Sequence, residues 1–208
     1  MSARDPGTEE RILIAARTVF LHKGYYGARM QEIADEAGIN KALLHYYFRS
    51  KDRLFEMIFM QAFARFVPVV ENILGGPDPL PVKISSFVDH YIDLLRTNPY
   101  LPQFILNEIT RDPDGLSRLF LASGLNPESY MQQVIRSLGP GMDSGSDFRH
   151  FMVNMLSMCI FPFVARPLLS RVMFGNDEAA YEHFLDERKK EVTSACLRMI
   201  GPSPVAPQ

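Results

Sequence analysis

Cysteine is scarce in this chain, and its placement argues against two kinds of site. Only Cys159 and Cys196 occur among 208 residues, and both lie within apolar, helix-like patterns. No CxxC pair or Cys/His spacing suited to a metal is present, so the sequence predicts neither a zinc site nor a redox motif. We expect two reduced, buried thiols, as is usual in cytosolic proteins.

Catalytic and targeting signals are missing as well. No Ser/His/Asp set, nucleotide-binding glycine loop or paired-carboxylate motif has a useful spacing, so we expect no enzyme, no cofactor and no metal. The polar N-terminus does not resemble a secretion signal. Polar residues, including Asn154 and Arg166, interrupt the most apolar stretch, residues 151–169. We therefore predict a cytoplasmic protein without a membrane partner.

The chain also lacks a strong charge of one sign, but its charges are unevenly distributed. The formal net charge is −2. Residues 1–51 contain eight Lys/Arg and six Asp/Glu, a net of +2, which leaves −4 for the remainder. A mildly basic N-terminal part on an acidic body suits an anionic partner at one end of the molecule.

Apolar residues recur with helical spacing, and no segment shows the alternation of a strand. Ile12, Ala16, Val19 and Phe20 illustrate this spacing in the first expected helix, which Thr8 is suited to cap. The pattern predicts an all-α fold of about nine helices, one of them over about 147–170 with a kink or break near a proline. Glycine and proline mark the expected breaks at Gly24, Gly38, 75–79, 98–99, 112–113, 126–127 and 139–145.

Residues 30–51 are the most informative segment. Two short amphipathic helices, expected at 30–37 and 41–47, are separated by Gly38, and Asn40 is suited to cap the second. A longer helix is expected to follow Ser50 and to reach about residue 74. Two short helices joined by a tight glycine turn are typical of a helix-turn-helix, whose second helix enters the major groove of DNA.

Four motifs lie in and around this segment: Lys23-Gly24-Tyr25, Ile33-Ala34-Asp35-Glu36-Ala37-Gly38-Ile39, Leu44-His45-Tyr46-Tyr47-Phe48 and Ser50-Lys51-Asp52-Arg53-Leu54. They resemble the DNA-binding domain of the TetR/AcrR family of bacterial transcriptional regulators. The resemblance implies a helix-turn-helix domain at 1–55 and a C-terminal helical domain for ligand binding and dimerisation at 56–200. The tail at 201–208 holds three prolines and is expected to be disordered. Three residues depart from the common pattern: Asn40 and Arg29 replace Ser or Thr, and His45 replaces Tyr.

Candidate DNA contacts lie on the outward side of this motif. Small Ala42 permits close approach to the groove, and Leu43 suits a thymine methyl group. Lys51 begins the following helix, where an ammonium and free backbone amides favour the same phosphate. Leu44, Tyr47 and Phe48 are instead expected to turn inward. The full set of predicted contacts is Arg29, Met30, Gln31, Lys41, Ala42, Leu43, His45, Tyr46 and Lys51.

Aromatic residues and methionines are frequent in the expected C-terminal domain. The resemblance implies that this region encloses a pocket for a small hydrophobic or aromatic effector, and methionine adapts to such ligands. Each residue is also suited to an ordinary core, and Glu108 has Arg111 one turn away as an alternative partner. The candidate pocket residues are Phe59, Phe63, Phe66, Phe87, Tyr91, Phe104, Asn107, Glu108, Met152 and Met155.

Two apolar stripes, on the helices expected at about 147–170 and 177–200, suggest a homodimer. Two such helices from each subunit would form a four-helix bundle across a two-fold axis. The alternative is a monomer in which both stripes are internal. The candidate interface residues are Val153, Ile160, Phe163, Tyr181, Phe184, Val192 and Cys196.

The sequence and the resemblance together predict a repressor that an effector releases from a palindromic, double-stranded DNA operator. The recognition helices of such a dimer would lie about 34–36 Å apart, one turn of DNA. Two alternatives remain open. One is a helix-turn-helix protein without a small-molecule effector, either architectural or controlled by a protein partner. The other is an activator.

Overall fold

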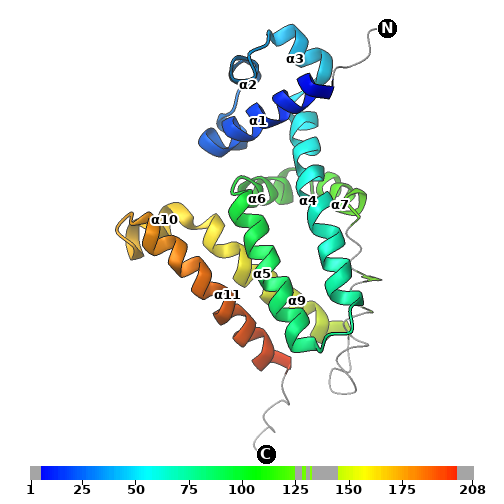
Figure 1. Cartoon of the computed structure of the whole chain (residues 1–208), viewed down its shortest axis with the longest axis vertical. Helices are drawn as coiled ribbons and strands as arrows, with labels where there is room; N and C mark the ends of the chain where they lie inside the picture. Colours follow the sequence, from blue (N-terminus) through cyan, green and yellow to red (C-terminus); the bar gives the residue numbers. More distant parts are fainter. Residues whose placement is uncertain (1–5, 125–127, 130–131, 133–144, 201–208) are drawn as a thin grey trace, which may run out of the picture. The chain divides into compact units, whose positions relative to one another are not determined.

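The computed structural model describes residues 6–124, 128–129, 132 and 145–200, and within these residues it contains ten α-helices and no strands (Figure 1). The predicted all-α class is confirmed. The segment between the expected breaks at 126–127 and 139–145 lies largely outside the described residues, and the tail at 201–208 lies wholly outside them. The helices are α1 (Pro6–Gly27), α2 (Met30–Glu36), α3 (Lys41–Tyr47), α4 (Lys51–Gly75), α5 (Leu80–Thr97), α6 (Leu101–Arg111), α7 (Pro113–Ala122), α9 (Gly145–Val164), α10 (Arg166–Met173) and α11 (Glu178–Ile200).

The chain divides into two compact units. Unit 1 contains the described residues of Met1–Arg65 and Asn98–Gly124, and unit 2 contains those of Phe66–Thr97 and Leu125–Gln208. Helices α6 and α7 therefore group with α1–α3, and α4 contributes residues to both units. The boundary predicted after residue 55 separates a DNA-binding part from a part for ligand binding and dimerisation. This division by function stays a prediction.

The core of unit 1 is built from aromatic side chains on α1, α4 and α6. Phe55 of α4 has no exposed surface. Its ring centroid lies 5.2 Å from that of Phe20, 5.3 Å from that of Tyr25 and 3.7 Å from that of Phe104. Aromatic contacts of this kind contribute about 0.5–1.5 kcal/mol beyond the area they bury. They attach α6 firmly to α1 and to the start of α4.

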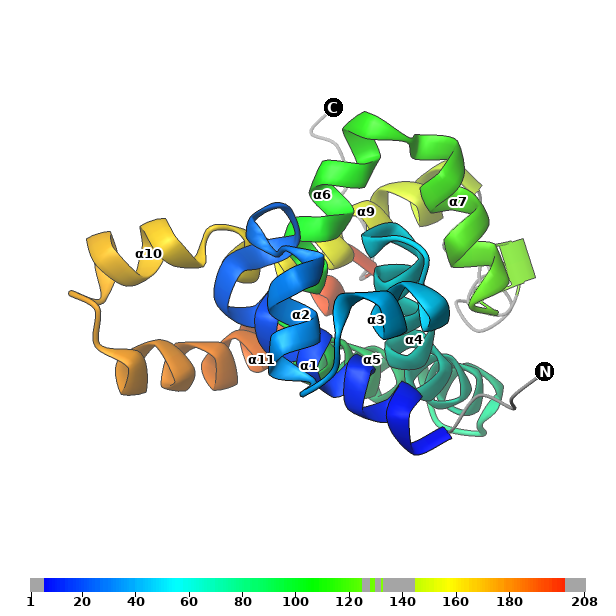
Figure 2. The ribbon, with the colours of Figure 1, turned by 90° about the horizontal axis from the view of Figure 1, so that it is seen from above.

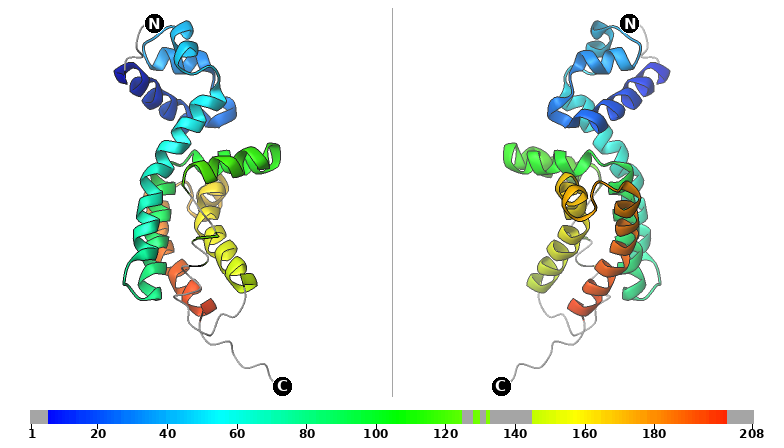
Figure 3. Two further views of the ribbon diagram at one scale, coloured as in Figure 1. Left: turned by 90° about the vertical axis from the view of Figure 1, so that its right-hand side faces the viewer. Right: turned by 90° about the vertical axis from the view of Figure 1, so that its left-hand side faces the viewer.

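The core of unit 2 lies where α5, α9 and α11 contact one another; Figure 3 shows the yellow ribbon of α9 and the orange-to-red ribbon of α11. Both cysteines belong to this core and are free thiols, as predicted. Burial raises the pKa of Cys159 to about 12 and that of Cys196 to about 11. Because the thiolate is the reactive form, both thiols are unreactive near neutral pH.

The helix expected over about 147–170 is two helices, α9 and α10, which meet at Ala165 with a bend of 70°. The predicted break near a proline is confirmed. Pro162 has no N–H, so the carbonyl of Met158 lacks its helical donor. Arg188 of α11 replaces it, with Nε at 3.3 Å and a second guanidinium nitrogen at 3.2 Å. Tyr181 donates its hydroxyl to the carbonyl of Pro162 at 2.6 Å.

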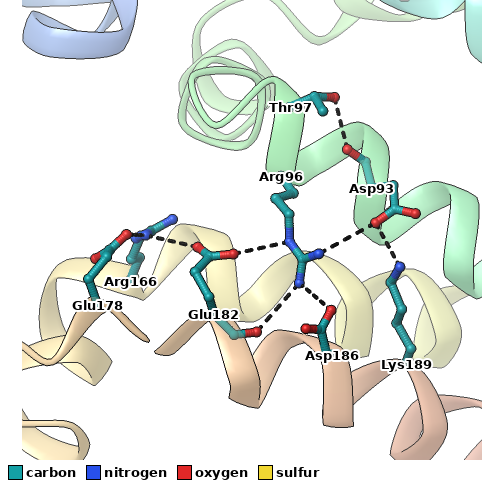
Figure 4. A network of polar contacts seen from close by, with 8 residues as sticks. All are labelled: Asp93, Arg96, Thr97, Arg166, Glu178, Glu182, Asp186 and Lys189. Atoms are coloured by element: carbon teal, nitrogen blue, oxygen red, sulfur yellow. Dashed lines mark hydrogen bonds and ion pairs between the residues drawn. The ribbon is translucent and has the colours of Figure 1, made fainter. Parts of the chain in front are cut away.

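Charged side chains connect α5, α10 and α11 at the surface of unit 2 (Figure 4). The Arg96 guanidinium of α5 lies 3.2 Å from a Glu182 carboxylate oxygen and 2.8 Å from one of Asp186, both on α11. Arg166, the first residue of α10, pairs with the same Glu182 and with Glu178. Glu182 therefore joins two arginines, which connects the bend between α9 and α10 to α5.

Two parts of the described chain are long and apolar enough to cross a membrane: α4, and the bent pair of α9 and α10. Core helices of soluble proteins satisfy the same criteria, because a helix buried on several sides is apolar all round. The apolar side chains of α4 include Phe55, Ile58 and Phe59, which have no exposed surface in this structure.

Candidate nucleic-acid interface

Helices α2 and α3 form a helix-turn-helix with its turn at residues 37–40. Gly38 has φ of +66°, a left-handed conformation that an L side chain adopts only with strain. The amide of Ile39 donates to the carbonyl of Ala34 at 3.0 Å, which closes the end of α2. Asn40 caps α3 as predicted, because its side chain accepts a hydrogen bond from the amide of Leu43 at 2.8 Å.

Helix α3 has one buried side and one exposed side. Leu44, Tyr47 and Phe48 are 0%, 9% and 5% exposed, which confirms that they turn inward. Tyr46 is 53% exposed. The predicted outward positions are all exposed: Lys41, Ala42, Leu43, His45 and Tyr46. The side that could enter a DNA groove is thus supported by a core on the opposite side, and Figure 2 shows α3 beside α2.

The start of α2 carries three further predicted contacts. Arg29 is exposed at the N-cap position, and its amide donates to a Glu32 carboxylate oxygen at 3.2 Å. Glu32 also pairs with Lys23 at 2.8 Å, and these two contacts lower its pKa. Gln31 is exposed and donates to Asp35 at 2.7 Å. Met30 is half-buried.

Lys51 has an internal role that the sequence reasoning missed. Its ammonium donates to the carbonyls of Tyr25 at 2.8 Å and Ala28 at 3.2 Å, and it lies 4.5 Å from the centroid of the Tyr25 ring. Partial burial lowers the pKa of Lys51. An ammonium has three N–H donors, so one remains for a phosphate. The local sequence carries no signal for contacts that span more than twenty residues.

A series of polar contacts connects Asp52, the residue after Lys51, to α6. Asp52 accepts a hydrogen bond from the Tyr25 hydroxyl and lies 3.6 Å from the Arg111 guanidinium. Arg111 donates twice to one oxygen of Glu108, at 2.8 and 3.2 Å. Burial and then the bond to Asp52 raise the pKa of Tyr25. Arg111, the alternative partner expected for Glu108, thus pairs with it. Through its contact with Asp52, Arg111 also links α6 to the beginning of α4.

The predicted pocket residues are distributed over both units. In unit 1, Phe59 and Phe63 stack with centroids 4.3 Å apart, and Glu108 and Phe104 line a hollow of about 290 Å³ together with charged residues such as Asp52. Asn107 is half-buried. In unit 2, the rings of Phe66, Phe87 and Tyr91 have centroids 5.7–6.0 Å apart, Met155 is buried, and Met152 packs at the edge of the core. The pocket assignment stays a prediction.

Several predicted interface residues lie in the core of unit 2. Tyr181, Val192 and Cys196 have no exposed surface, and Phe163 is 7% exposed, so a partner would not touch them in this arrangement. Ile160 and Phe184 are half-buried. The apolar stripe predicted for the helix at about 177–200 is the side of α11 that packs in the core of unit 2. Helical periodicity identifies an apolar side of a helix, but it does not tell whether that side faces the core or a partner subunit. The largest exposed apolar residues of α9 and α10 are Val153, Phe161, Leu168, Val172 and Met173.

Comparisons with known proteins agree with the helix-turn-helix of α2 and α3 and with the all-α fold. The family model described as "Bacterial regulatory proteins, tetR family" matches residues 12–58. The chain is 35% identical to the HTH-type transcriptional repressor SCO4008 of Streptomyces coelicolor, over 91% of this chain and 96% of that protein. It is 23% identical to the probable HTH-type transcriptional regulator YttP of Bacillus subtilis, over 84% and 86%. Its fold resembles that of the TetR family regulator PfmR of Thermus thermophilus, with a TM-score of 0.66, 19% identity and coverage of 93% and 99%.

Proposed function

The chain belongs to the TetR family of bacterial transcriptional regulators, and from this we propose that it is a repressor that binds a palindromic operator as a homodimer and leaves it when a small, largely apolar effector binds. DNA binding and transcriptional regulation are common to the family. Repression and release by an effector are the finer part of the proposal. A cytoplasmic location is part of the same proposal.

The observation that carries the proposal is the exposed side of α3. Lys41, Leu43 and Tyr46 project from a helix whose opposite side is buried, so their positions are set by the core and not by flexible loops. Such a helix presents donors and apolar groups to base edges. Arg29 and Gln31 at the start of α2 add candidates for phosphate contacts.

Selection of bound sequences from a random DNA pool tests this role. The expected product is a palindrome whose half-sites lie about one helical turn apart. Lys41→Ala should weaken binding to the selected duplex, whereas Lys190→Ala, which removes an equally exposed lysine from α11, should not. Equal effects of the two substitutions, or no enriched sequence, would contradict the assignment of α3.

The effector proposal depends on the aromatic and methionine side chains of the two units. Aromatic clusters such as Phe66, Phe87 and Tyr91, with Met152 nearby, supply the apolar surface that a hydrophobic ligand needs. A ligand changes operator affinity only by the difference between its affinities for the two states. The test is to screen apolar and aromatic compounds for a change in operator affinity. If none changes it, the alternative without an effector is favoured, and DNA binding stands.

The direction of regulation needs a separate measurement. A dimer bound over a promoter represses, and one bound upstream of it can recruit polymerase. A reporter gene behind the selected operator should lose expression when the protein is present. A gain in expression would favour the activator alternative.

A further inference from the structure

His45 lies on the exposed side of α3, and the chain itself holds its ring. Nδ1 lies 3.2 Å from the carbonyl oxygen of Arg49, four residues further on. A carbonyl oxygen only accepts hydrogen bonds, so Nδ1 carries a proton in this contact. In the neutral ring the other nitrogen, Nε2, is then an acceptor with a lone pair. It becomes a donor only when the ring is an imidazolium.

Positive charges flank His45 in the sequence. Lys41 precedes it by four residues, Arg49 follows it by four, and all three are exposed. Residues four apart share one side of a helix, so Lys41 and His45 lie on the same side of α3. Arg49 continues the series just beyond the end of the helix at Tyr47. Such a series suits the phosphates of a DNA strand.

The acidic residues of the neighbouring helix α2 are paired with other residues or exposed. Helix α2 packs against α3 and carries Glu32, Asp35 and Glu36. Glu32 pairs with Lys23, and Asp35 accepts from Gln31. Glu36 is exposed. Among the residues that the structure describes, none forms an ion pair with the imidazole. Lys41 and Arg49 are the charged groups on its own segment.

We propose that His45 binds a DNA phosphate only as the imidazolium, so that the DNA affinity of this protein rises as pH falls through the neutral range. The neutral ring would present the Nε2 lone pair to a phosphate oxygen, and two acceptors repel. The protonated ring donates a charge-assisted hydrogen bond from Nε2 while Nδ1 keeps its bond to Arg49. The inference rests on the proposed DNA-binding role of α3.

The test measures binding of a fluorescent random-sequence duplex by anisotropy, at constant ionic strength, from about pH 8 to about pH 6. For the wild-type protein, log Kd should fall with falling pH, with a slope that approaches about one for each engaged His45. His45→Gln should abolish this slope. His45→Arg, which is charged throughout, should bind tightly and without a slope. His183→Gln, an exposed histidine of α11, should behave as wild type.

Calorimetry in buffers of different ionisation enthalpy gives a second readout, because wild-type protein should take up protons on binding and His45→Gln should not. The inference is overturned if the wild-type slope is flat, or if His45→Gln keeps it. Loss of salt-dependent DNA binding at every pH would instead overturn the proposed function. Circular dichroism melting of each variant at both pH limits separates these results from loss of the fold.

Discussion

At the scale of single residues, the Lys51 ammonium has two roles, one in internal hydrogen bonds and one in the proposed contact with a DNA phosphate. Its hydrogen bonds to the carbonyls of Tyr25 and Ala28 attach the first turn of α4 to the end of α1. Its position at a helix N-terminus also suits a phosphate. The internal bonds orient the side chain and leave one N–H for DNA.

Lys51→Ala should therefore reduce both stability and DNA binding. Two carbonyls lose their donor, which costs about 1–3 kcal/mol of unfolding free energy, measurable by urea denaturation. The slope of log K against log salt should flatten by about one for the lost phosphate contact. Arg53→Ala at the exposed neighbouring position is the stability control. A stability loss with an unchanged salt slope would leave Lys51 a purely structural role.

Gly38 is a second residue whose conformation decides a local structure. Gly38→Ala should destabilise the protein by about 1–2 kcal/mol, because φ of +66° strains an L residue while the space around a new Cβ is open. Thermal unfolding measures the change. Gly75→Ala, where a Cβ also meets open space but no positive φ is involved, is the matched control. Equal effects at both positions would contradict the conformational explanation.

At the scale of helices, the bend between α9 and α10 depends on donors from α11. Pro162 removes a helical amide inside α9, Pro167 lies in the first turn of α10, and Arg188 and Tyr181 supply donors in the same region. The bend is thus a property of three helices together, although the prolines that cause it belong to one segment.

Arg188→Met keeps an unbranched aliphatic stem, although a shorter one, and removes the donor to the carbonyl of Met158. We expect a loss of about 1–3 kcal/mol in unfolding free energy, since a carbonyl in the helix pair is left without a partner. Lys190→Met, at an exposed position of the same helix, should change stability by less than about 0.5 kcal/mol. Similar losses for both variants would show that the carbonyl contact is unimportant.

The ion pairs between α5 and α11 predict that the unfolding free energy depends on pH in the acid range. The hydrogen bond and charge of Arg96 lower the pKa of Asp186 in the folded protein. This contribution is therefore complete above the unfolded pKa of Asp186 and is lost as pH falls through the lowered folded value. Arg96→Met should lower the unfolding free energy at neutral pH. As the pH falls, the unfolding free energy of this variant should then decrease less than that of the wild type. Parallel pH profiles of wild type and Arg96→Met, from urea denaturation, would contradict this account.

At the scale of the whole molecule, a homodimer would cover apolar surface that one chain leaves exposed. Phe161, Leu168 and Val172 of α9 and α10 are 57–71% exposed. Val153 and Met173 of the same two helices are exposed as well. Large exposed apolar patches mark protein interfaces, and we propose these residues of α9 and α10 for the dimer contact.

Phe161→Glu should shift the protein toward a monomer in sedimentation at micromolar concentration, because a carboxylate would be buried in the interface. DNA affinity should fall with it, since a monomer contacts only one half-site. Leu121→Glu, at a similarly exposed apolar position of α7 in unit 1, should stay dimeric. A wild-type protein that sediments as a monomer would refute the dimer.

Local chemistry allowed much of the N-terminal part to be derived from the sequence. Asn40, Gly38 and the spacing of Leu44 and Tyr47 act within a few residues, so they determine the ends of α3 and its buried side without reference to the rest of the chain. The family motifs could be recognised for the same reason, because they are continuous in the sequence.

Only the tertiary structure decided the roles that depend on distant partners. It placed Tyr181 and Cys196 in the core of unit 2, gave Lys51 its carbonyl acceptors, and joined Glu108 through Arg111 to Asp52. The physical reason is that periodicity in the sequence tells which residues share one side of a helix. Which other residues that side contacts depends on how the whole chain packs.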